Sequence, residues 1–141
     1  MSNTLGQQRA DFTLQALRKN LAGKGNDKKT LREEFSSFTA SLPAMILQNG
    51  FGQTLAFLLV KATDSKTHKF KKNDKHYVAY SIITDWIVRN EYLKKGNEDT
   101  IISQVSKMNQ DDYLQAQREA LAMLEWLKRF ANAALFFEGG K

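Results

Sequence analysis

Apolar residues recur at spacings of three and four along most of the chain, which is the period of a helix with one buried face. A first stripe predicts a helix over residues 4–21 and consists of Ala10, Leu14, Leu17 and Leu21. A second helix begins at about Asp27 or Thr30, and Thr30 and Glu33 have the spacing of a capping box. Its stripe consists of Leu31, Phe35, Phe38 and Leu42.

The only proline of the chain, Pro43, interrupts this pattern. Proline cannot donate a backbone hydrogen bond and disfavours helix at the residue before it, so the second helix either kinks there or stops and restarts. Asn49-Gly50 then predicts a helix end, and a new helix covers residues 51–62. We expect this helix to be the most buried, because residues 55–60 are apolar on nearly every side. We also expect Gly52 to allow a neighbouring backbone to come close.

The second half of the chain predicts a lysine-rich connection over residues 64–76 and then three more helices. They cover about residues 76–93, 99–108 and 110–137, and Asn109 is expected to cap the last. No internal repeat or low-complexity linker separates the helices. The pattern therefore predicts an all-α fold, a single compact bundle of about five to six helices that forms one domain over residues 1–141.

The last predicted helix carries two apolar stripes, which is more than one core contact needs. One interpretation is a central helix that packs on two sides within the domain. The other is a surface for a protein partner, since aromatic side chains are enriched at interfaces. The candidate interface residues are Trp126, Phe130, Phe136 and Phe137.

Composition is that of an ordinary globular protein, with 42% hydrophobic and 26% charged residues in a chain of 141. There is no cysteine, which excludes disulfides and thiolate metal sites and suits a reducing cytoplasm. The first residues lack the apolar region of a signal peptide, and no segment approaches the roughly 20 apolar residues that span a bilayer. We therefore expect a cytoplasmic protein with no membrane partner.

Positive charge is concentrated in the first half of the chain. The formal net charge is +6, with +7 over residues 1–76 and −1 over residues 77–141, which suggests a polyanionic partner on one side of the molecule. The candidate RNA-binding residues lie around the first helix–helix turn and in the lysine-rich connection: Arg18, Lys19, Lys24, Lys28, Lys29, Lys66, Lys69, Lys71, Lys72 and Lys75. Arg32 and Lys61 flank them, and Phe70 lies among the connection lysines, where it could stack on a base. Lysine favours phosphate attraction over base reading, and a merely solvated face is the alternative.

Groups suited to catalysis are scarce. His68 and His76 both lie in the lysine-rich connection and have no fixed neighbour in the sequence that would orient them. Metal-site and phosphate-loop motifs are absent, and the adjacent carboxylates Asp111 and Asp112 fit the N-terminus of a helix. We expect no enzymatic activity, no cofactor, no metal and no small-molecule substrate.

Two segments carry a resemblance to a known family. They are L-P-A-M-I-L-Q-N-G-F-G-Q-T-L-A-F, residues 42–57, and A-L-A-M-L-E-W-L-K-R-F-A, residues 120–131. In this order they resemble the small subunit of the Cmr complex, the RNA-guided type III-B CRISPR effector, over roughly residues 31–135. Phe51 stands between the two glycines, where the family usually has leucine.

The resemblance implies a small helical bundle that stacks in several copies along an elongated effector complex. Its partners would be the other Cmr subunits, including the backbone subunits, copies of itself, and the guide and target RNA, while cleavage would belong to other subunits. It assigns core roles to Leu42, Pro43, Gly50, Leu55, Leu124, Trp126 and Leu127.

Two alternatives follow from the residues alone. A free-standing basic helical DNA-binding protein would need a recognition helix with exposed base-reading side chains, and no predicted helix has a compact cluster of Arg, Asn and Gln. A small ribonuclease would rest on His68 and His76 alone.

Overall fold

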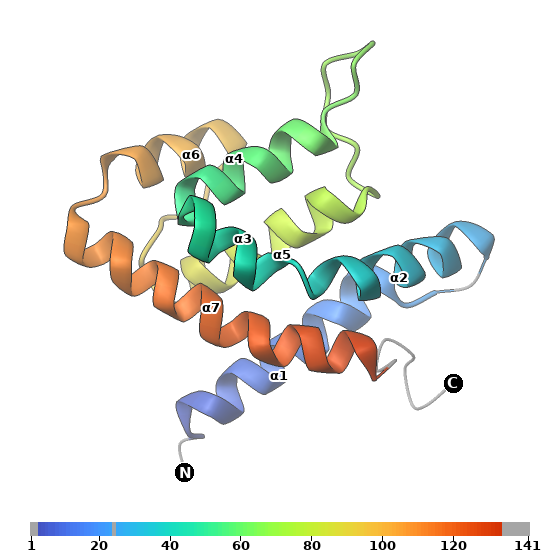
Figure 1. Cartoon of the computed structure of the whole chain (residues 1–141), viewed down its shortest axis with the longest axis horizontal. Coiled ribbons are helices and arrows are strands. Elements are labelled where there is room, and N and C mark those ends of the chain that lie inside the picture. The colour runs from blue at the N-terminus through green and yellow to red at the C-terminus, as the bar shows by residue number, and fades with distance from the viewer. Residues whose placement is uncertain (1–2, 24, 134–141) are drawn as a thin grey trace.

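Helices make up most of this protein. A computed structural model describes residues 3–23 and 25–133, and Figure 1 shows these residues as helices joined by short connections. The helices are α1 (Leu5–Leu21), α2 (Asn26–Thr39), α3 (Leu42–Asn49), α4 (Phe51–Ala62), α5 (Lys75–Arg89), α6 (Glu98–Lys107) and α7 (Gln110–Asn132). The all-α prediction is confirmed, with seven helices in the described residues against the five to six expected.

The seventh helix results from the interruption at Pro43. Helix α2 ends at Thr39, residues 40–41 make a turn, and α3 restarts with Pro43 in its first turn. Of the two outcomes that the sequence left open, stopping and restarting is therefore the one that occurs. Proline is tolerated there because the first N–H groups of a helix have no partner within it.

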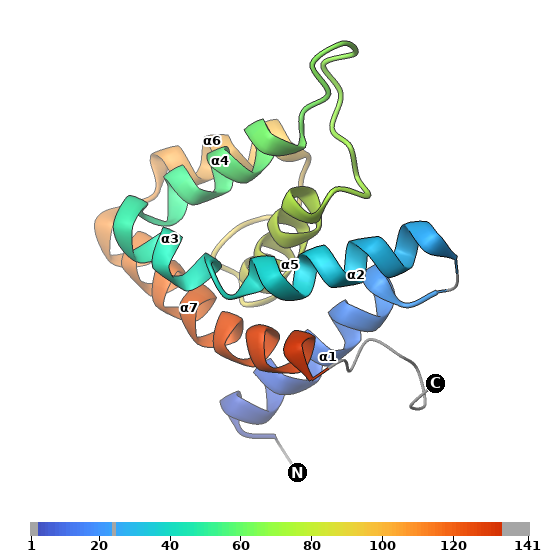
Figure 2. The same ribbon diagram turned by 45° about the vertical axis from the view of Figure 1, so that its right-hand side comes forward.

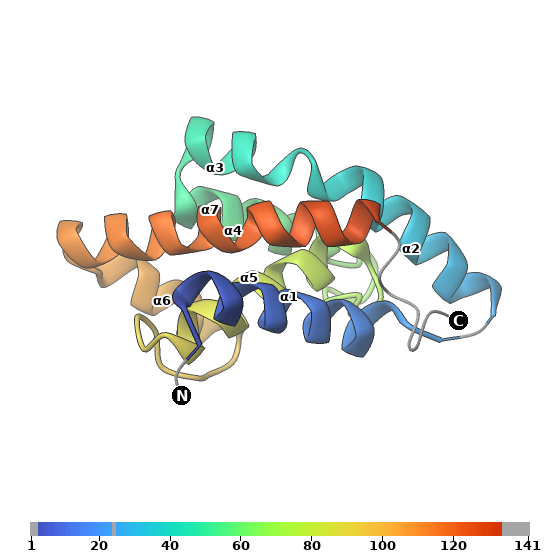
Figure 3. The same cartoon turned by 90° about the horizontal axis from the view of Figure 1, so that it is seen from below.

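Helix α7 crosses the other helices and organises their packing. It contacts α1, α2, α3 and α5, and Figure 3 shows it between α3 on one side and α1 on the other. Its buried residues are Ala116, Ala120, Met123, Leu124, Leu127 and Ala131. Helix α4 packs on α5, so the core lies between α7 and this pair (Figure 2).

Two expectations about individual helices are wrong. Helix α2 begins at Asn26, next to the start at Asp27 that the sequence offered, but it has no side-chain cap, so Thr30 lies inside the helix and the capping box with Glu33 is not formed. The most buried helix is α5 rather than α4, because α5 packs against α1, α2, α4 and α7. Helix α4 turns one apolar edge outward, where Val60 is 69% exposed.

The predicted helix boundaries hold best where a cap marks them. The side chain of Asn109 accepts a hydrogen bond from the Asp112 N–H at 2.8 Å, and α7 starts at the next residue, as expected. Helix α5 ends at Arg89, four residues before the predicted end, since Asn90 and the positive φ of Glu91 terminate it. The predicted end of the last helix at residue 137 lies outside the described residues.

The corner between α3 and α4 is clamped by side chains from α7. Gly50 has a φ of 88°, which an L-residue rarely adopts. The backbone N–H of Phe51 donates to the Gln117 side chain at 2.9 Å, and that of Gly52 donates to the Tyr113 hydroxyl at 2.7 Å. Close approach at Gly52 is therefore made by a tyrosine hydroxyl and not by a neighbouring backbone, as the sequence had suggested.

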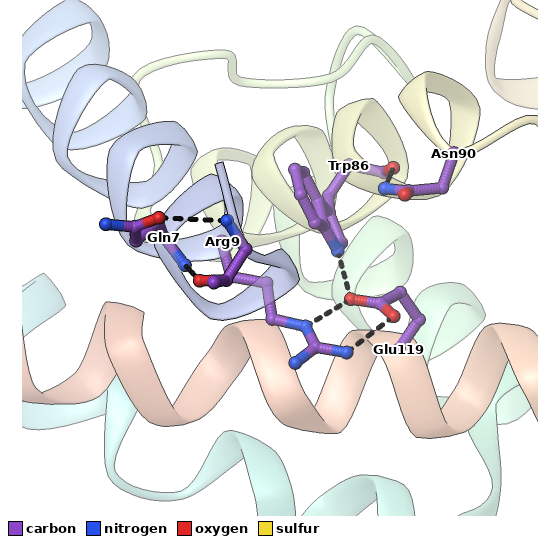
Figure 4. Close-up of polar contacts among 6 residues, drawn as sticks. Gln7, Arg9, Trp86, Asn90 and Glu119 are labelled. Carbon is purple, nitrogen blue, oxygen red and sulfur yellow. Dashed lines mark hydrogen bonds and ion pairs between the residues drawn. The ribbon is translucent and has the colours of Figure 1, made fainter. Parts of the chain in front are cut away.

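An ion-pair network joins three helices that are far apart in the sequence (Figure 4). The Arg9 guanidinium of α1 donates two hydrogen bonds to the Glu119 carboxylate of α7, at 2.6 and 2.9 Å. The indole N–H of Trp86, in α5, donates to the same carboxylate at 2.9 Å. These hydrogen bonds, with that from Arg9 as the main cause, lower the pKa of Glu119.

Candidate nucleic-acid interface

The lysine-rich connection between α4 and α5 forms a narrow hairpin that projects beyond the helices (Figures 1 and 2). An isolated antiparallel bridge joins Thr63 and Phe70 at its base. Near its tip, the Asp64 side chain accepts hydrogen bonds from the N–H groups of Lys66 and Thr67, which lower its pKa. The exposed lysines of the hairpin, Lys66, Lys69, Lys71 and Lys72, are therefore held on a defined loop.

Aromatic rings and lysines lie together where the hairpin meets the helices. The rings of Phe38 and Phe57 each meet His76 edge-on, with ring centres 4.8 and 6.3 Å from it. The ammonium group of Lys75 lies 5.7 Å from the Phe38 ring, and that of Lys61 lies 5.6 Å from the Phe57 ring. Phe57 is partly exposed, so this surface offers both a ring and positive charge.

Phe70 does not supply the exposed ring that its place in the sequence suggested. It is half-buried against the core and lies 5.9 Å from the Tyr77 ring. The ammonium group of Lys72 lies 5.7 Å from the centre of the Tyr77 ring. Phe57 is the better-placed ring for stacking.

The first basic segment is partly used inside the protein. Arg32 is buried and donates to the carbonyls of Leu21 and Gly23, both at 2.9 Å, where α1 ends. Lys28 donates to the carbonyl of Asn20 at 3.0 Å. Helix C-termini have unpaired carbonyl groups, so these two side chains have a structural role there.

The remaining residues of that segment differ in exposure. Lys19 and Lys29 are exposed, and Arg18 is half-buried, whereas Lys24 lies outside the described residues. Lys28 and Asn73 line one hollow of about 300 Å³, so the start of α2 and the end of the hairpin are neighbours. Asp27 and Glu34 also line it, so the positive surface is interrupted by carboxylates.

The two histidines occupy different environments. His68 is exposed in the hairpin with a φ of 60°, whereas His76 is half-buried at the start of α5. The Nδ1 atom of His76 lies 2.7 Å from a carboxylate oxygen of Asp74, which also caps the helix. His76 is thus fixed by a carboxylate and two rings, and within the described residues no hydrogen bond or ring contact joins it to His68.

Some apolar side chains of α7, α3 and α4 remain partly uncovered. On α7, Trp126 and Phe130 are half-buried, with ring centres 5.6 Å apart, while Leu124 and Leu127 are buried. On α3 and α4, Leu47 is 70% and Val60 is 69% exposed. Phe136 and Phe137 lie outside the described residues. The exposure of Leu47 and Val60 was not predicted, because both residues belong to segments that looked wholly buried.

Sequence reasoning also missed a hollow beside α5. It is lined by Tyr77, Tyr80 and Asp85 of α5, together with Lys19 of α1 and Lys95 of the α5–α6 connection. A signal existed in the sequence, since residues 77, 80, 81, 84 and 85 are polar or amphipathic and fall on one side of a helix. The described residues contain no group of three or more metal-ligating side chains and no helix suited to crossing a membrane.

The fold and its surface define a small all-α protein with a basic hairpin beside partly exposed aromatic rings. The model of the family described as CRISPR-associated protein (Cas_Cmr5) matches residues 5–134. The CRISPR system Cmr subunit Cmr5 of Thermus thermophilus is 29% identical over 104 residues, which are 74% of this chain and 77% of that protein. The chain therefore belongs to the Cmr small-subunit family of type III-B CRISPR systems, as the resemblance of its sequence had indicated. The match also extends to α1, beyond the region in which that resemblance was noticed.

Proposed function

We propose that this protein is a non-catalytic small subunit of a cytoplasmic type III-B CRISPR effector complex. Several copies stack along the complex, contact the other subunits including its backbone, and meet the guide and target RNA through a basic surface. Family membership supports the place in a Cmr complex. The observation that carries the RNA contact is the projecting hairpin with its four exposed lysines, together with the partly exposed Phe57 ring, which lies beside Lys61 and His76.

The chemistry of this surface suits RNA held by its backbone. Ammonium groups attract phosphates without selecting a sequence, and an exposed ring stacks on any base. Such a contact tolerates the changing sequences of guide and target. The partly uncovered side chains of Trp126, Leu47 and Val60 are suited to protein partners, including further copies of the chain.

Reversing the charge of the hairpin tests the RNA contact. In a complex assembled with the Lys69→Glu, Lys71→Glu, Lys72→Glu variant, we expect capture of labelled target RNA to fall at least tenfold, because attraction becomes repulsion. The matched control reverses three exposed cations elsewhere, Lys94, Lys107 and Arg118, and gives the same net charge. Capture is measured by filter binding, and unchanged thermal unfolding shows that the variants fold.

An equal loss with both variants would mean that only net charge matters, and undiminished capture would remove the hairpin from the interface. The protein purified from its native cells should carry short RNAs that share a CRISPR repeat tag. Selective binding of duplex DNA by the isolated protein would instead support the alternative of a free-standing DNA-binding protein.

A further inference from the structure

His76 lies in a cluster of aromatic and charged side chains from α2, α4 and α5, at the base of the hairpin. The rings of Phe38 and Phe57 flank its imidazole, with ring centres 4.8 and 6.3 Å away. One ammonium group lies near each of these rings, that of Lys75 at 5.7 Å from Phe38 and that of Lys61 at 5.6 Å from Phe57. Both positive charges are therefore separated from the imidazole by a single ring.

Asp74 fixes the orientation of this imidazole. One oxygen of its carboxylate lies 2.7 Å from Nδ1 of His76 and also accepts a hydrogen bond from the backbone N–H of His76 at 2.7 Å. An ionised carboxylate can only accept, so Nδ1 is the donor in this pair. The other ring nitrogen, Nε2, therefore carries a hydrogen only when the imidazole is protonated.

The Nε2 atom of His76 is open to solvent. It has no hydrogen-bond partner within the described residues, where the buried side-chain atoms that lack a partner belong to Arg18, Thr54 and Tyr80. The His76 side chain keeps 17% of its surface accessible. A ligand can therefore reach Nε2 while the rest of the ring remains packed.

The charges around the ring favour an anion. Lys61 and Lys75 would repel a cation, and the Asp74 carboxylate already accepts two hydrogen bonds from His76. A protonated imidazole adds a positive charge and an N–H donor, and both suit a phosphate oxygen. Beside it, the Phe57 ring is 38% exposed, so a base attached to that phosphate has an aromatic surface on which to stack.

We propose that protonated His76 binds an RNA phosphate through Nε2, next to a base on Phe57, and that Asp74 is its positioning residue. This inference rests on the proposed RNA contact and adds to it a site whose affinity for RNA depends on pH. Imidazole changes charge between about pH 5 and 8, whereas ammonium groups stay charged throughout that range.

The other titratable groups around the ring do not change charge between these pH values. Carboxylates and ammonium groups ordinarily titrate outside this range, and those within four positions of Phe38, Phe57 and His76 are Glu34, Lys61, Lys72, Asp74 and Lys75. The phenols of Tyr77 and Tyr80 have pKa values that are raised by burial, so they stay neutral. A pH effect that depends on this cluster therefore reports the imidazole.

The pH dependence of RNA affinity tests this site. Fluorescence anisotropy is measured at constant salt with the full-length protein and a labelled oligouridylate, whose bases do not titrate between about pH 5.5 and 8. We expect the association constant to rise at least fivefold from pH 8 to pH 5.5, because binding takes up one proton and gains one charged contact.

Three substitutions assign this rise to one residue. His76→Gln should abolish it and leave the affinity at pH 8 within about twofold, because the neutral ring donates nothing from Nε2. His68→Gln is the matched control and should keep the rise, since His68 is the other histidine of the chain and lies exposed in the hairpin. Asp74→Asn preserves the helix cap but should move the rise to lower pH, because the imidazolium loses its countercharge.

Thermal unfolding shows whether the variants fold, and if His76→Gln does not, the displaced profile of Asp74→Asn remains the test. The inference is overturned if RNA affinity does not change between pH 8 and 5.5, if His76→Gln keeps the rise, or if His68→Gln loses it. Calorimetry with sulfate distinguishes a free anion from RNA. Sulfate binding that His76→Gln abolishes, without a pH effect on RNA affinity, would also overturn the inference.

The hairpin charge-reversal variant separates this site from the proposed hairpin contact. It should bind RNA more weakly at both pH values and keep the same relative rise. Binding that this variant weakens but that does not depend on pH would contradict the His76 site alone. Binding that this variant leaves undiminished, with a rise that His76→Gln removes, would contradict the hairpin contact alone.

Discussion

Glu119 is the residue on which the contacts between α1, α5 and α7 converge. Its carboxylate accepts two hydrogen bonds from Arg9 and one from Trp86, and it is mostly shielded from water. An ion pair in this position requires that every partner be satisfied, because a buried charge without partners is strongly unfavourable. The network therefore fixes how three helices meet, in addition to the apolar packing around it.

The pH dependence of folding tests this network. Because the folded state lowers the pKa of Glu119, its contribution is fully present above the unfolded pKa, near 4.5, and is lost as the pH falls through the lower folded value. We expect Glu119→Gln to reduce the free energy of unfolding by about 2 kcal/mol at pH 6, with a smaller difference at pH 3. Urea denaturation at the two pH values measures this.

Glu125→Gln is the matched control, because the Glu125 side chain is 45% accessible on α7 and, in the described residues, pairs with Lys128 and Arg129 of the same helix. We expect that substitution to change stability by less than about 0.5 kcal/mol at either pH. A loss in Glu119→Gln that is the same at pH 6 and pH 3 would show that the carboxylate charge contributes nothing.

Helix α7 combines a buried face with a partly uncovered one. Leu124 and Leu127 are buried in the core, whereas Trp126, between them in the sequence, is half-buried and contacts Phe130. Of the core roles that the family resemblance assigned, those of Leu42, Leu55, Leu124 and Leu127 agree with their burial. Trp126 differs from them, which favours the interface interpretation of its stripe.

Substitutions on the two faces of α7 should separate stability from assembly. Leu127→Ala should cost about 2–5 kcal/mol, since it leaves a cavity in the core. Trp126→Ala should cost less than about 2 kcal/mol, because part of the ring already contacts water, and should weaken co-purification with the other Cmr subunits. Urea denaturation and affinity purification provide the two measurements, and a loss of 3–5 kcal/mol for Trp126→Ala would place the ring in the core.

Sequence patterns predicted the helices well and their surroundings poorly. Local signals were sufficient to place the helix boundaries at Pro43, Gly50 and Asn109, since a cap or a helix break depends only on the backbone of adjacent residues. The burial of α5 and the outward edge of α4 depend on which helices surround them. The spacing of apolar residues within one helix does not indicate its neighbours. Arg9 and Glu119 are likewise far apart in the sequence, so only the fold brings them together.

For the candidate interface, the sequence supplied the charge but not its distribution. It predicted basic residues around the α1–α2 turn, yet Lys28 and Arg32 hold the end of α1. It also suggested Phe70 as a stacking ring, and the structure offers Phe57 instead. Such choices depend on side-chain direction in three dimensions, which the order of residues along a loop does not determine.

At the scale of the whole molecule, exposed positive charge is concentrated on the projecting hairpin, and carboxylates interrupt it near the start of α2. An interface of this kind gains affinity mainly by releasing counterions from RNA, so it depends steeply on salt. The net charge of +6 adds a weaker long-range attraction.

The salt dependence of RNA binding reports how many phosphates the protein contacts. If six lysines meet phosphates of single-stranded RNA, the logarithm of the binding constant should fall with the logarithm of salt concentration with a slope of about −4. The hairpin charge-reversal variant removes three of these contacts, so its slope should be about −2. Fluorescence anisotropy between 50 and 300 mM salt gives both slopes, and equal slopes would exclude the hairpin.

Helix α7 is synthesised after every helix that it packs against. The earlier helices therefore leave the ribosome with their apolar faces uncovered, and the α3–α4 corner lacks the side chains of Tyr113 and Gln117 that clamp it. We expect a nascent chain halted before α7 to remain unfolded and accessible to proteases, since no smaller part of the molecule closes the core. On this expectation, a chain that lacks α7 has no folded form with which to join other subunits.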